Sequence, residues 1–262
     1  MKKRSITIWI SCIMIIVGII MVIIGASLGA SFGYMGNHDT ESFTRDYTQK
    51  INTVDIEYNI GKIIIKKGDQ LKIVADEVRK DSVRTDVSGD KLTIETSDDH
   101  FPFFYSGKSE LTVYIPDNIS YFSVKTDIGQ LKISDITADE VVIKAGVGET
   151  YISNLTSKKT TIKAGVGEFN INNSDLSNLD LKSGVGEVNI NAKINGDCEI
   201  KGGIGDINLN LSNSIDDYRF DFSNGIGDIS VNGSNYKHFK NRDGEHLMKV
   251  ENGIGDIEID ME

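Results

Sequence analysis

The chain has 262 residues and a formal net charge of −11, with 28 lysine and arginine residues against 39 aspartate and glutamate residues. This balance argues against nucleic-acid binding, which needs a basic face. Hydrophobic residues make up 39% of the chain, enough for a folded core, while two cysteines are too few for a disulfide framework. The combination of 26 glycines with two prolines is typical of β-structure with many tight turns.

The N-terminal segment has three basic residues within its first four positions and continues into a long apolar run. The strongest part of this run, 6–25, would span about 30 Å as a helix, which matches one hydrocarbon core. We therefore predict a cytoplasmic basic stub over 1–5 and a transmembrane anchor over 6–30. Because basic residues precede the run and acids dominate after it, the positive-inside rule places the N-terminus in the cytoplasm and the C-terminal domain outside the cell.

A cleaved signal peptide is the alternative interpretation of this segment, since Ala26 and Ala30 offer a cleavage site. The apolar run is longer than the h-region of a signal peptide, about 7–15 residues, and this length favours a retained anchor. Gly25, Gly29 and Gly33 would share one helical face. They either let a second helix approach closely or reflect the frequency of glycine near the ends of membrane helices.

Two less regular segments follow the anchor. Residues 31–50 are expected to link it to the folded domain, and we interpret 51–125 as the irregular opening part and cap of that domain. One short loop in it holds too many aromatic residues for an ordinary solvated loop, so they either plug the end of the core or form a contact site. These aromatic residues are Phe101, Phe103, Phe104 and Tyr105.

The segment 126–262 repeats one pattern, in which strand-like residues surround G-[VI]-G-[ED] or a close variant. The first four intervals between central glycines are 19 residues each, the last two are 22 and 28, and a weaker copy surrounds Gly61. A fixed period near 20 residues is typical of stacked repeat architectures, in which these glycines would form the turns. The seven central glycines are Gly129, Gly148, Gly167, Gly186, Gly205, Gly227 and Gly255.

Apolar residues stand at the same places in every copy, five and one residues before the central glycine and, with few exceptions, two and four residues after it. This alternation of β-branched and polar residues predicts two short strands per repeat. The alternation slips by one residue at the glycine, so we expect the chain to turn a corner there with both strands facing one interior. Ile162 and Val166, five and one residues before Gly167, are both expected in the core.

The matched columns favour an all-β fold, a single-chain β-solenoid similar to a β-helix, with coils of about 19 residues and one N-terminal transmembrane helix. An antiparallel meander with hairpins at the glycines is the alternative, but it leaves the matched columns unexplained. In a solenoid, Asn170, Asn189 and Asn208 would stack and hydrogen-bond along the ladder. Cys198 occupies an apolar column and is expected to be a buried thiol rather than a reactive one.

The G-[VI]-G-[ED] strand repeats, the preceding VYIPDNI and the single N-terminal anchor resemble the bacterial family named "putative adhesins". These are membrane-anchored β-strand-repeat proteins whose domain has no known function. The resemblance covers Ile51 to Ile259. It implies a β-helix-like fold, a cell-surface location and an adhesive or envelope-related role, and it supplies no catalytic residues.

An acidic column follows the central glycines and is the one candidate metal site. Stacked carboxylates about 4.8 Å apart repel unless something neutralises them, and calcium could do so. The alternative, which we favour, is that each carboxylate accepts backbone N–H bonds at the turn while a lysine column four residues before the glycines reduces the repulsion. The acids are Glu149, Glu168, Glu187, Asp206, Asp228 and Asp256.

Enzyme chemistry has little support in the sequence. The G-x-G motif recurs with strands after it, whereas a dinucleotide site needs a third glycine and a following helix. No pair among the four histidines has a chelating spacing, so we expect no zinc site and no cofactor. A polysaccharide-active β-helix enzyme would need acids clustered with arginine or lysine on one face, and the acids here form an even ladder.

We therefore expect a surface-exposed, membrane-anchored and non-enzymatic module for adhesion or envelope binding, with the membrane and an unidentified wall polymer or protein as partners. An envelope-stress accessory protein acting through a membrane partner is the alternative. The final strand, 255–262, is expected to be an open edge at the end of the solenoid. Its alternating acids, among them Glu258 and Asp260, would repel a second edge and keep the outer domain monomeric.

Overall fold

The computed structural model describes residues 18, 39–96, 109–116, 119–240 and 243–262. Two compact units divide the chain, and all but one residue of the smaller, Met1–His38 with Asp99–Ser106, lies outside the described residues. The transmembrane anchor predicted over 6–30 and the aromatic loop of 101–105 therefore lie outside them too. Among the described residues, no helix has the length and apolarity that a membrane span requires.

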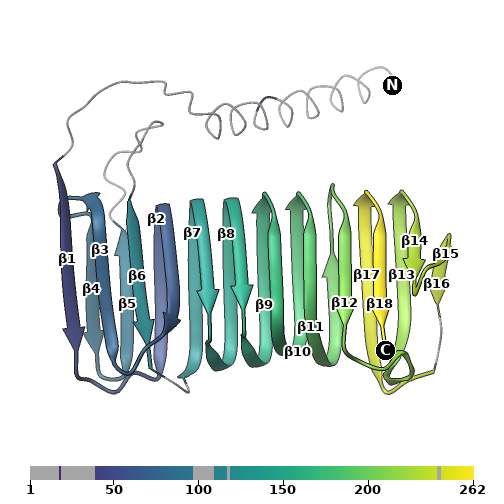
Figure 1. Ribbon diagram of the computed structural model, residues 1–262, viewed down its shortest axis with the longest axis horizontal. Coiled ribbons are helices and arrows are strands. Elements are labelled where there is room, and N and C mark those ends of the chain that lie inside the picture. Colours follow the sequence, from purple (N-terminus) through teal and green to yellow (C-terminus); the bar gives the residue numbers. More distant parts are fainter. Residues whose placement is uncertain (1–17, 19–38, 97–108, 117–118, 241–242) are drawn as a thin grey trace, which may run out of the picture. The chain divides into compact units, whose positions relative to one another are not determined.

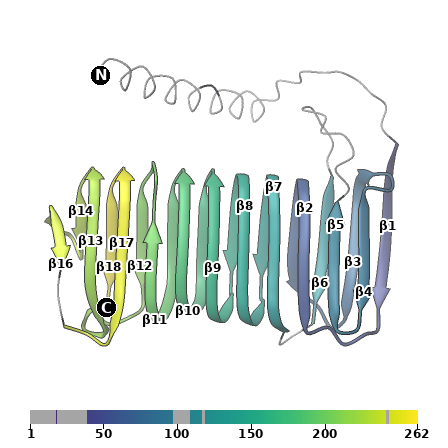
Figure 2. The same ribbon diagram turned by 180° about the vertical axis from the view of Figure 1, so that it is seen from behind.

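The larger unit is built from strands, which lie in one row from β1 at one end to β16 at the other in both Figure 1 and Figure 2. Its single helical turn is the 3-10 helix Ile215–Asp217 among the described residues. The all-β prediction is therefore confirmed. The strands are β1 (Thr40–Tyr47), β2 (Thr53–Lys67), β3 (Leu71–Arg79), β4 (Val83–Ser88), β5 (Lys91–Thr96), β6 (Glu110–Ile115), β7 (Ile119–Ser134), β8 (Thr137–Ser153), β9 (Thr156–Val166), β10 (Phe169–Val185), β11 (Val188–Lys201), β12 (Ile207–Leu211), β13 (Tyr218–Ile226), β14 (Ile229–Val231), β15 (Ser234–Tyr236), β16 (His238–Lys240), β17 (His246–Ile254) and β18 (Ile257–Met261).

The repeats stack as parallel coils, each in register with the next. Ile143 pairs with Ile162, Ile162 with Leu181, and Leu181 with Ile200, so equivalent residues lie directly above one another. All four side chains are fully buried and form one column of a continuous apolar core. Parallel pairing contradicts the antiparallel meander, and it follows from the repeat because the same residue types recur at each level.

The C-terminal coil does not form an open edge, which corrects the sequence prediction. Strand β18 pairs with β12 on one side and β14 on the other, and β17 pairs with β11 and β13. The Gly255 coil thus lies between the Gly205 and Gly227 coils, out of sequence order. The 28-residue interval before Gly255 explains this arrangement. The chain forms the Gly227 coil at the end of the stack, and the long interval then lets it return to form the Gly255 coil in the level between.

A short hairpin and an aromatic cluster close the C-terminal end. Strand β15 pairs with β14, and β16 pairs with β13, both antiparallel. Phe239 of β16 lies 5.5 Å from Phe220 and 5.6 Å from Phe222 between ring centroids, and Tyr236 packs edge-on against it at 4.6 Å. These rings cover apolar side chains of the terminal coil that would otherwise meet water.

The N-terminal end is also built out of sequence order. Strand β2 stacks directly on β7, with Gly61 opposite Gly129, so the weaker repeat is a regular coil inside the segment predicted to be irregular. On the other side, β2 pairs in parallel with β5 and β6. The remaining pairs at this end, β3 with β6, β4 with β5 and β1 with β3, are antiparallel. Residues 40–47 are therefore a strand, not the linker predicted over 31–50. Phe43 and Tyr47 explain the difference, because both pack against the core.

The corner of each coil differs from the prediction in one respect. Ile162 is buried as expected, but Val166 is only half-buried, and its equivalents Ile128, Ile204 and Ile254 are 42%, 39% and 45% exposed. The central glycine has φ between +124° and +141° in all eight coils, a backbone conformation that residues other than glycine rarely adopt. The turn therefore begins before the glycine, and the residue preceding it points outward.

Candidate functional site

Two columns of glycine backbone form the corner of the stacked coils. A Cβ atom built on Gly167 would lie 1.9 Å from the carbonyl oxygen of Gly148, and one built on Gly165 would lie 2.3 Å from that of Gly146. No side chain fits at either place, because successive corners touch through their backbones. The residue between the two glycines is therefore flanked on both sides by bare backbone.

That residue is valine or isoleucine in every coil, and we call the resulting column the corner ridge. It follows the order of the coils in space, with each residue paired to the next. In six coils bare glycine backbone on both sides leaves the aliphatic side chain above its surroundings, whereas Asn59 precedes Ile60 and Asp127 precedes Ile128. The corner ridge consists of Ile60, Ile128, Val147, Val166, Val185, Ile204, Ile254 and Ile226.

The predicted acidic column lies along one side of the corner ridge, and five of its six carboxylates accept hydrogen bonds within the protein. Asp206 accepts a hydrogen bond from the backbone N–H of Asp256 at 2.8 Å, and Asp256 accepts one from the N–H of Asp228 at 2.8 Å. This is the pattern expected of turn carboxylates. Glu168 and Glu187 instead accept from asparagine side chains, as described below.

The next question is whether the acidic column could bind a metal ion. In the part of the chain that the structure describes, no group of three or more histidine, cysteine, aspartate or glutamate side chains is placed to hold one. In Glu149 the carboxylate accepts from Gln130 Nε2 at 2.9 Å and from the Tyr151 hydroxyl at 3.4 Å. Burial, together with Glu149 and Glu168, raises the pKa of Tyr151, so this hydroxyl stays a donor.

The lysine column lies on the other side of the corner ridge, four residues before each central glycine. The Nζ atom of Lys182 lies 3.5 Å from Oδ2 of Asp180 on the same strand. The Nζ atom of Lys201 lies 2.6 Å from Oε1 of Glu199, also on the same strand. The hydrogen bond from Lys201 lowers the pKa of Glu199. The corner ridge is thus bordered by a basic column and an acidic column that run parallel to it.

An amide-rich face covers the outer side of β10, β11, β12 and β18, and we call it the asparagine face. Asn189 donates to Asn170 at 3.2 Å, and Asn208 donates to Asn189 at 2.9 Å, which confirms the predicted ladder. These amides also reach the acidic column, because Asn170 donates to Glu168 at 3.1 Å and Asn208 donates to Glu187 at 3.0 Å.

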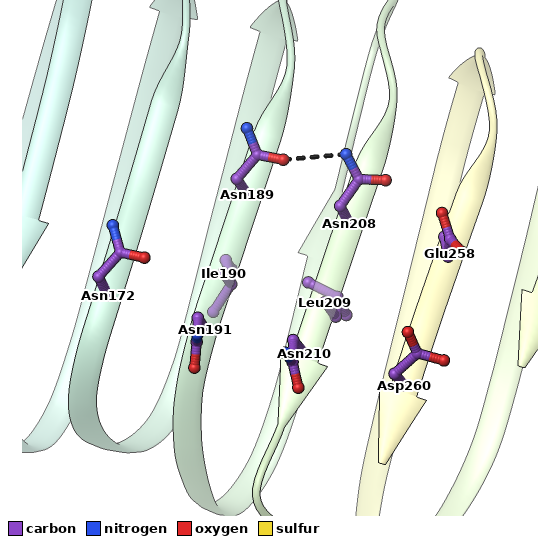
Figure 3. Close-up of a pocket in the computed structure, with 9 residues that line it drawn as sticks. All are labelled: Asn172, Asn189, Ile190, Asn191, Asn208, Leu209, Asn210, Glu258 and Asp260. Carbon is purple, nitrogen blue, oxygen red and sulfur yellow. Dashed lines mark hydrogen bonds between the residues drawn. The ribbon is translucent and has the colours of Figure 1, made fainter. Parts of the chain in front are cut away.

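The asparagine face is hollowed by an open depression of about 300 Å³ (Figure 3). Asn189 and Asn208 lie in one row that continues to Glu258, and Asn191 and Asn210 lie in a second row that continues to Asp260. The two carboxylates thus belong to a polar surface inside the stack, one coil from its C-terminal end. Sequence reasoning placed them at an exposed end because it could not foresee the position of β18.

The remaining predicted residues lie away from these surfaces. Cys198 is buried as predicted, and burial raises the pKa of its thiol to about 12. Tyr218, which donates to the carbonyl oxygen of Ile194, is also buried, and this burial raises its pKa. The one surface that sequence reasoning missed is the corner ridge. Its signal was present in six coils of the sequence, where an aliphatic residue stands between two glycines and has no side chain next to it along the chain.

Comparison with known proteins places the chain in a family. The family model described as Toastrack DUF4097 matches residues 51–260. Among solved structures, the chain is similar to a protein from Bacteroides fragilis named a "putative adhesin", with a TM-score of 0.52 and 19% identity over 84% of this chain and 98% of that one. At this identity the likeness shows the fold alone.

Two further solved structures are more distant. A "putative cell adhesion protein" from Clostridium sporogenes has a TM-score of 0.41 and 14% identity over 86% of this chain and 100% of that one. A "putative lipid binding protein" from Parabacteroides distasonis has a TM-score of 0.41 and 12% identity over 85% and 98%. Comparison with curated proteins finds no match. Because the Toastrack model matches most of the chain, the protein belongs to the Toastrack DUF4097 family.

Proposed function

We propose that the protein is a non-enzymatic adhesion or envelope-binding module and that the asparagine face binds a hydroxyl-rich polymer. The observation that carries this proposal is the double row of amides ending in Glu258 and Asp260 around the depression. Amides and carboxylates together offer donors and acceptors at the strand spacing of about 4.8 Å, which suits repeated sugar hydroxyls.

The surrounding chemistry supports binding rather than catalysis. The two groups of the described chain with the largest pKa displacements, Cys198 and Tyr218, are buried in the core and have no access to a substrate. A general acid or base must lie where a substrate can reach it. The name of the Bacteroides fragilis protein agrees with an adhesive role.

The proposed location follows from the sequence. Residues 1–5 would remain in the cytoplasm, 6–30 would cross the membrane and the repeat domain would face the wall polymer. Protease added to intact cells should then degrade the repeat domain. Protection of that domain, or a mature N-terminus after Ala30, would contradict the retained anchor.

Binding to purified wall polysaccharide tests the function itself. The full chain in detergent micelles should sediment with the polymer, and the Asn189→Ala/Asn208→Ala variant should bind several-fold more weakly, because it removes donors from β11 and β12, two of the four strands that line the depression. Asn235→Ala is the matched control, since Asn235 is exposed on β15, outside that face. Equal binding by all three proteins would contradict a role for the asparagine face.

A further inference from the structure

The corner ridge concentrates the exposed apolar surface of this protein. Within the described residues five large hydrophobic side chains are exposed, and four of them, Ile128, Ile204, Ile226 and Ile254, belong to the ridge. Such clustering in one column is not the scattered exposure that a soluble surface normally shows. The corner itself does not require an aliphatic residue, because the positive φ of the central glycine sets the geometry of the turn in all eight coils.

The dimensions of the corner ridge suit a modest protein interface. Eight residues at strand spacing make a strip about 34 Å long. The five backbone steps between the lysine and acidic columns add a width of at most about 17 Å. The strip therefore offers under about 600 Å² per molecule, at the lower end of specific interfaces.

Charge on both sides of the corner ridge identifies the partner. Lys144, Lys163, Lys182 and Lys201 border one side, and Glu149, Glu168, Glu187 and Asp206 border the other, with one of each in the same coil. In the Gly61 coil the signs are reversed together, since Glu57 takes the lysine position and Lys62 the acidic position. A surface with opposite charges on its two sides is complementary to itself.

The direction of the symmetry axis follows from these columns. A two-fold axis parallel to the corner ridge brings the lysine column of one copy onto the acidic column of the other, coil by coil. An axis across the ridge brings lysine onto lysine and acid onto acid, which is repulsive. The first arrangement also pairs Glu57 with Lys62. We propose that a second copy of this chain binds here, with the two ridges parallel and the two-fold axis along them.

The contact should be strongest in the middle of the ridge. The Gly255 coil carries Glu251 and Asp256, and the Gly227 coil carries Ser223 and Asp228, so neither offers a lysine to the partner's acids. The parallel arrangement also brings the N-terminal ends of both repeat domains to the same side. The expectation of a monomer rested on an open C-terminal edge, and the position of β18 removes that reason.

Cross-linking tests the arrangement in the full chain. Cys12, the other cysteine of the chain, is first replaced by serine. In that background Ile128→Cys should form a disulfide-linked dimer under mild oxidation in detergent micelles, because each Ile128 faces its own equivalent near the axis. Buried Cys198 should not compete. Thr137→Cys, which is exposed but outside the ridge, should cross-link several-fold less. Equal yields from both variants would overturn the interface. Cross-links that form only between Ile128→Cys and Ile254→Cys chains would overturn the parallel direction.

A charge exchange tests the partner. In the Ile128→Cys chain, Lys163→Glu places a carboxylate opposite the partner's Glu168 and should lower the yield of disulfide-linked dimer several-fold. Adding Glu168→Lys should restore that yield. Failure of the double variant to recover would overturn the proposal, as would a ridge variant that loses wall-polymer binding without changing dimer yield. Polymer binding by the Lys163→Glu variant should match the unchanged protein, so this test is separate from that of the asparagine face.

Discussion

At the scale of single residues, the corner glycines are the most constrained positions in the molecule. Gly167→Ala would force a side chain into a backbone with φ of +136° and place its Cβ against the oxygen of Gly148. We expect a loss of at least about 3 kcal/mol in the free energy of unfolding, measured with urea. Gly89→Ala is the control, because Gly89 has φ of +62° with open space around it. It should cost about 1–2 kcal/mol, and equal losses would contradict the corner geometry.

The two apolar positions before each glycine should respond differently to charge. Ile162→Asp would bury an unpaired carboxylate among Ile143 and Leu181 and should lower the free energy of unfolding by about 4 kcal/mol or more. Val166→Asp, on the corner ridge, should lower it by about 1 kcal/mol or less. Urea unfolding of both variants measures the difference. Similar losses would mean that the residue before the glycine faces the core after all.

Cys198 should make the fold sensitive to alkaline pH. Its pKa is raised from 9.0 to about 12 by burial, so the thiol binds its proton more tightly in the folded chain than in the unfolded one. The resulting stability is fully present below pH 9 and is lost as the pH rises toward about 12, at about 1.4 kcal/mol per pH unit. Urea unfolding between pH 8 and about 10.5 should therefore show a steeper decline for the unchanged protein than for Cys198→Ala. Parallel declines would contradict the burial of this thiol.

At the scale of the element, the order of the last two coils gives the C-terminal strand a structural role. Strands β17 and β18 hold Met248, Val250, Ile257 and Ile259 in the core, and they connect the terminal coil to the rest of the stack. Ending the chain after Asp243 should therefore also remove amide-exchange protection from β13 and β14, which lose their neighbours. Glu258→Ala, a change on the outer face of β18, should leave that protection intact. Retained protection in the truncated chain would contradict the order of the coils.

At the scale of the whole molecule, both ends of the stack are closed by chain that returns out of order. Phe239→Ala would uncover Phe220 and Phe222 at the C-terminal end, and we expect greater self-association than in the unchanged protein, measured by sedimentation velocity. His238→Ala changes an exposed neighbour on the same strand and should have no effect. Unchanged sedimentation of the Phe239→Ala variant would mean that this ring does not protect the end.

The sequence by itself determined the repeating part of this protein. The 19-residue period, the apolar columns of Ile143, Ile162 and Leu181, and the asparagine ladder all follow from local alternation and from stacking like residues at each level. The same reasoning predicted burial of Cys198, because its column is apolar. These features depend only on neighbours at fixed spacing, which a sequence displays directly.

Only the tertiary structure decided the order of the coils and the direction of the corner residues. Any coil of this repeat can stack on any other, so local pattern cannot show that Gly255 lies between Gly205 and Gly227 or that Glu258 and Asp260 continue the asparagine face. Alternation also cannot show which way Val166 points, because the glycine conformation that turns the corner interrupts the pattern it would follow. The two candidate surfaces therefore arise where long-range stacking and unusual backbone geometry, rather than local periodicity, set the position of each side chain.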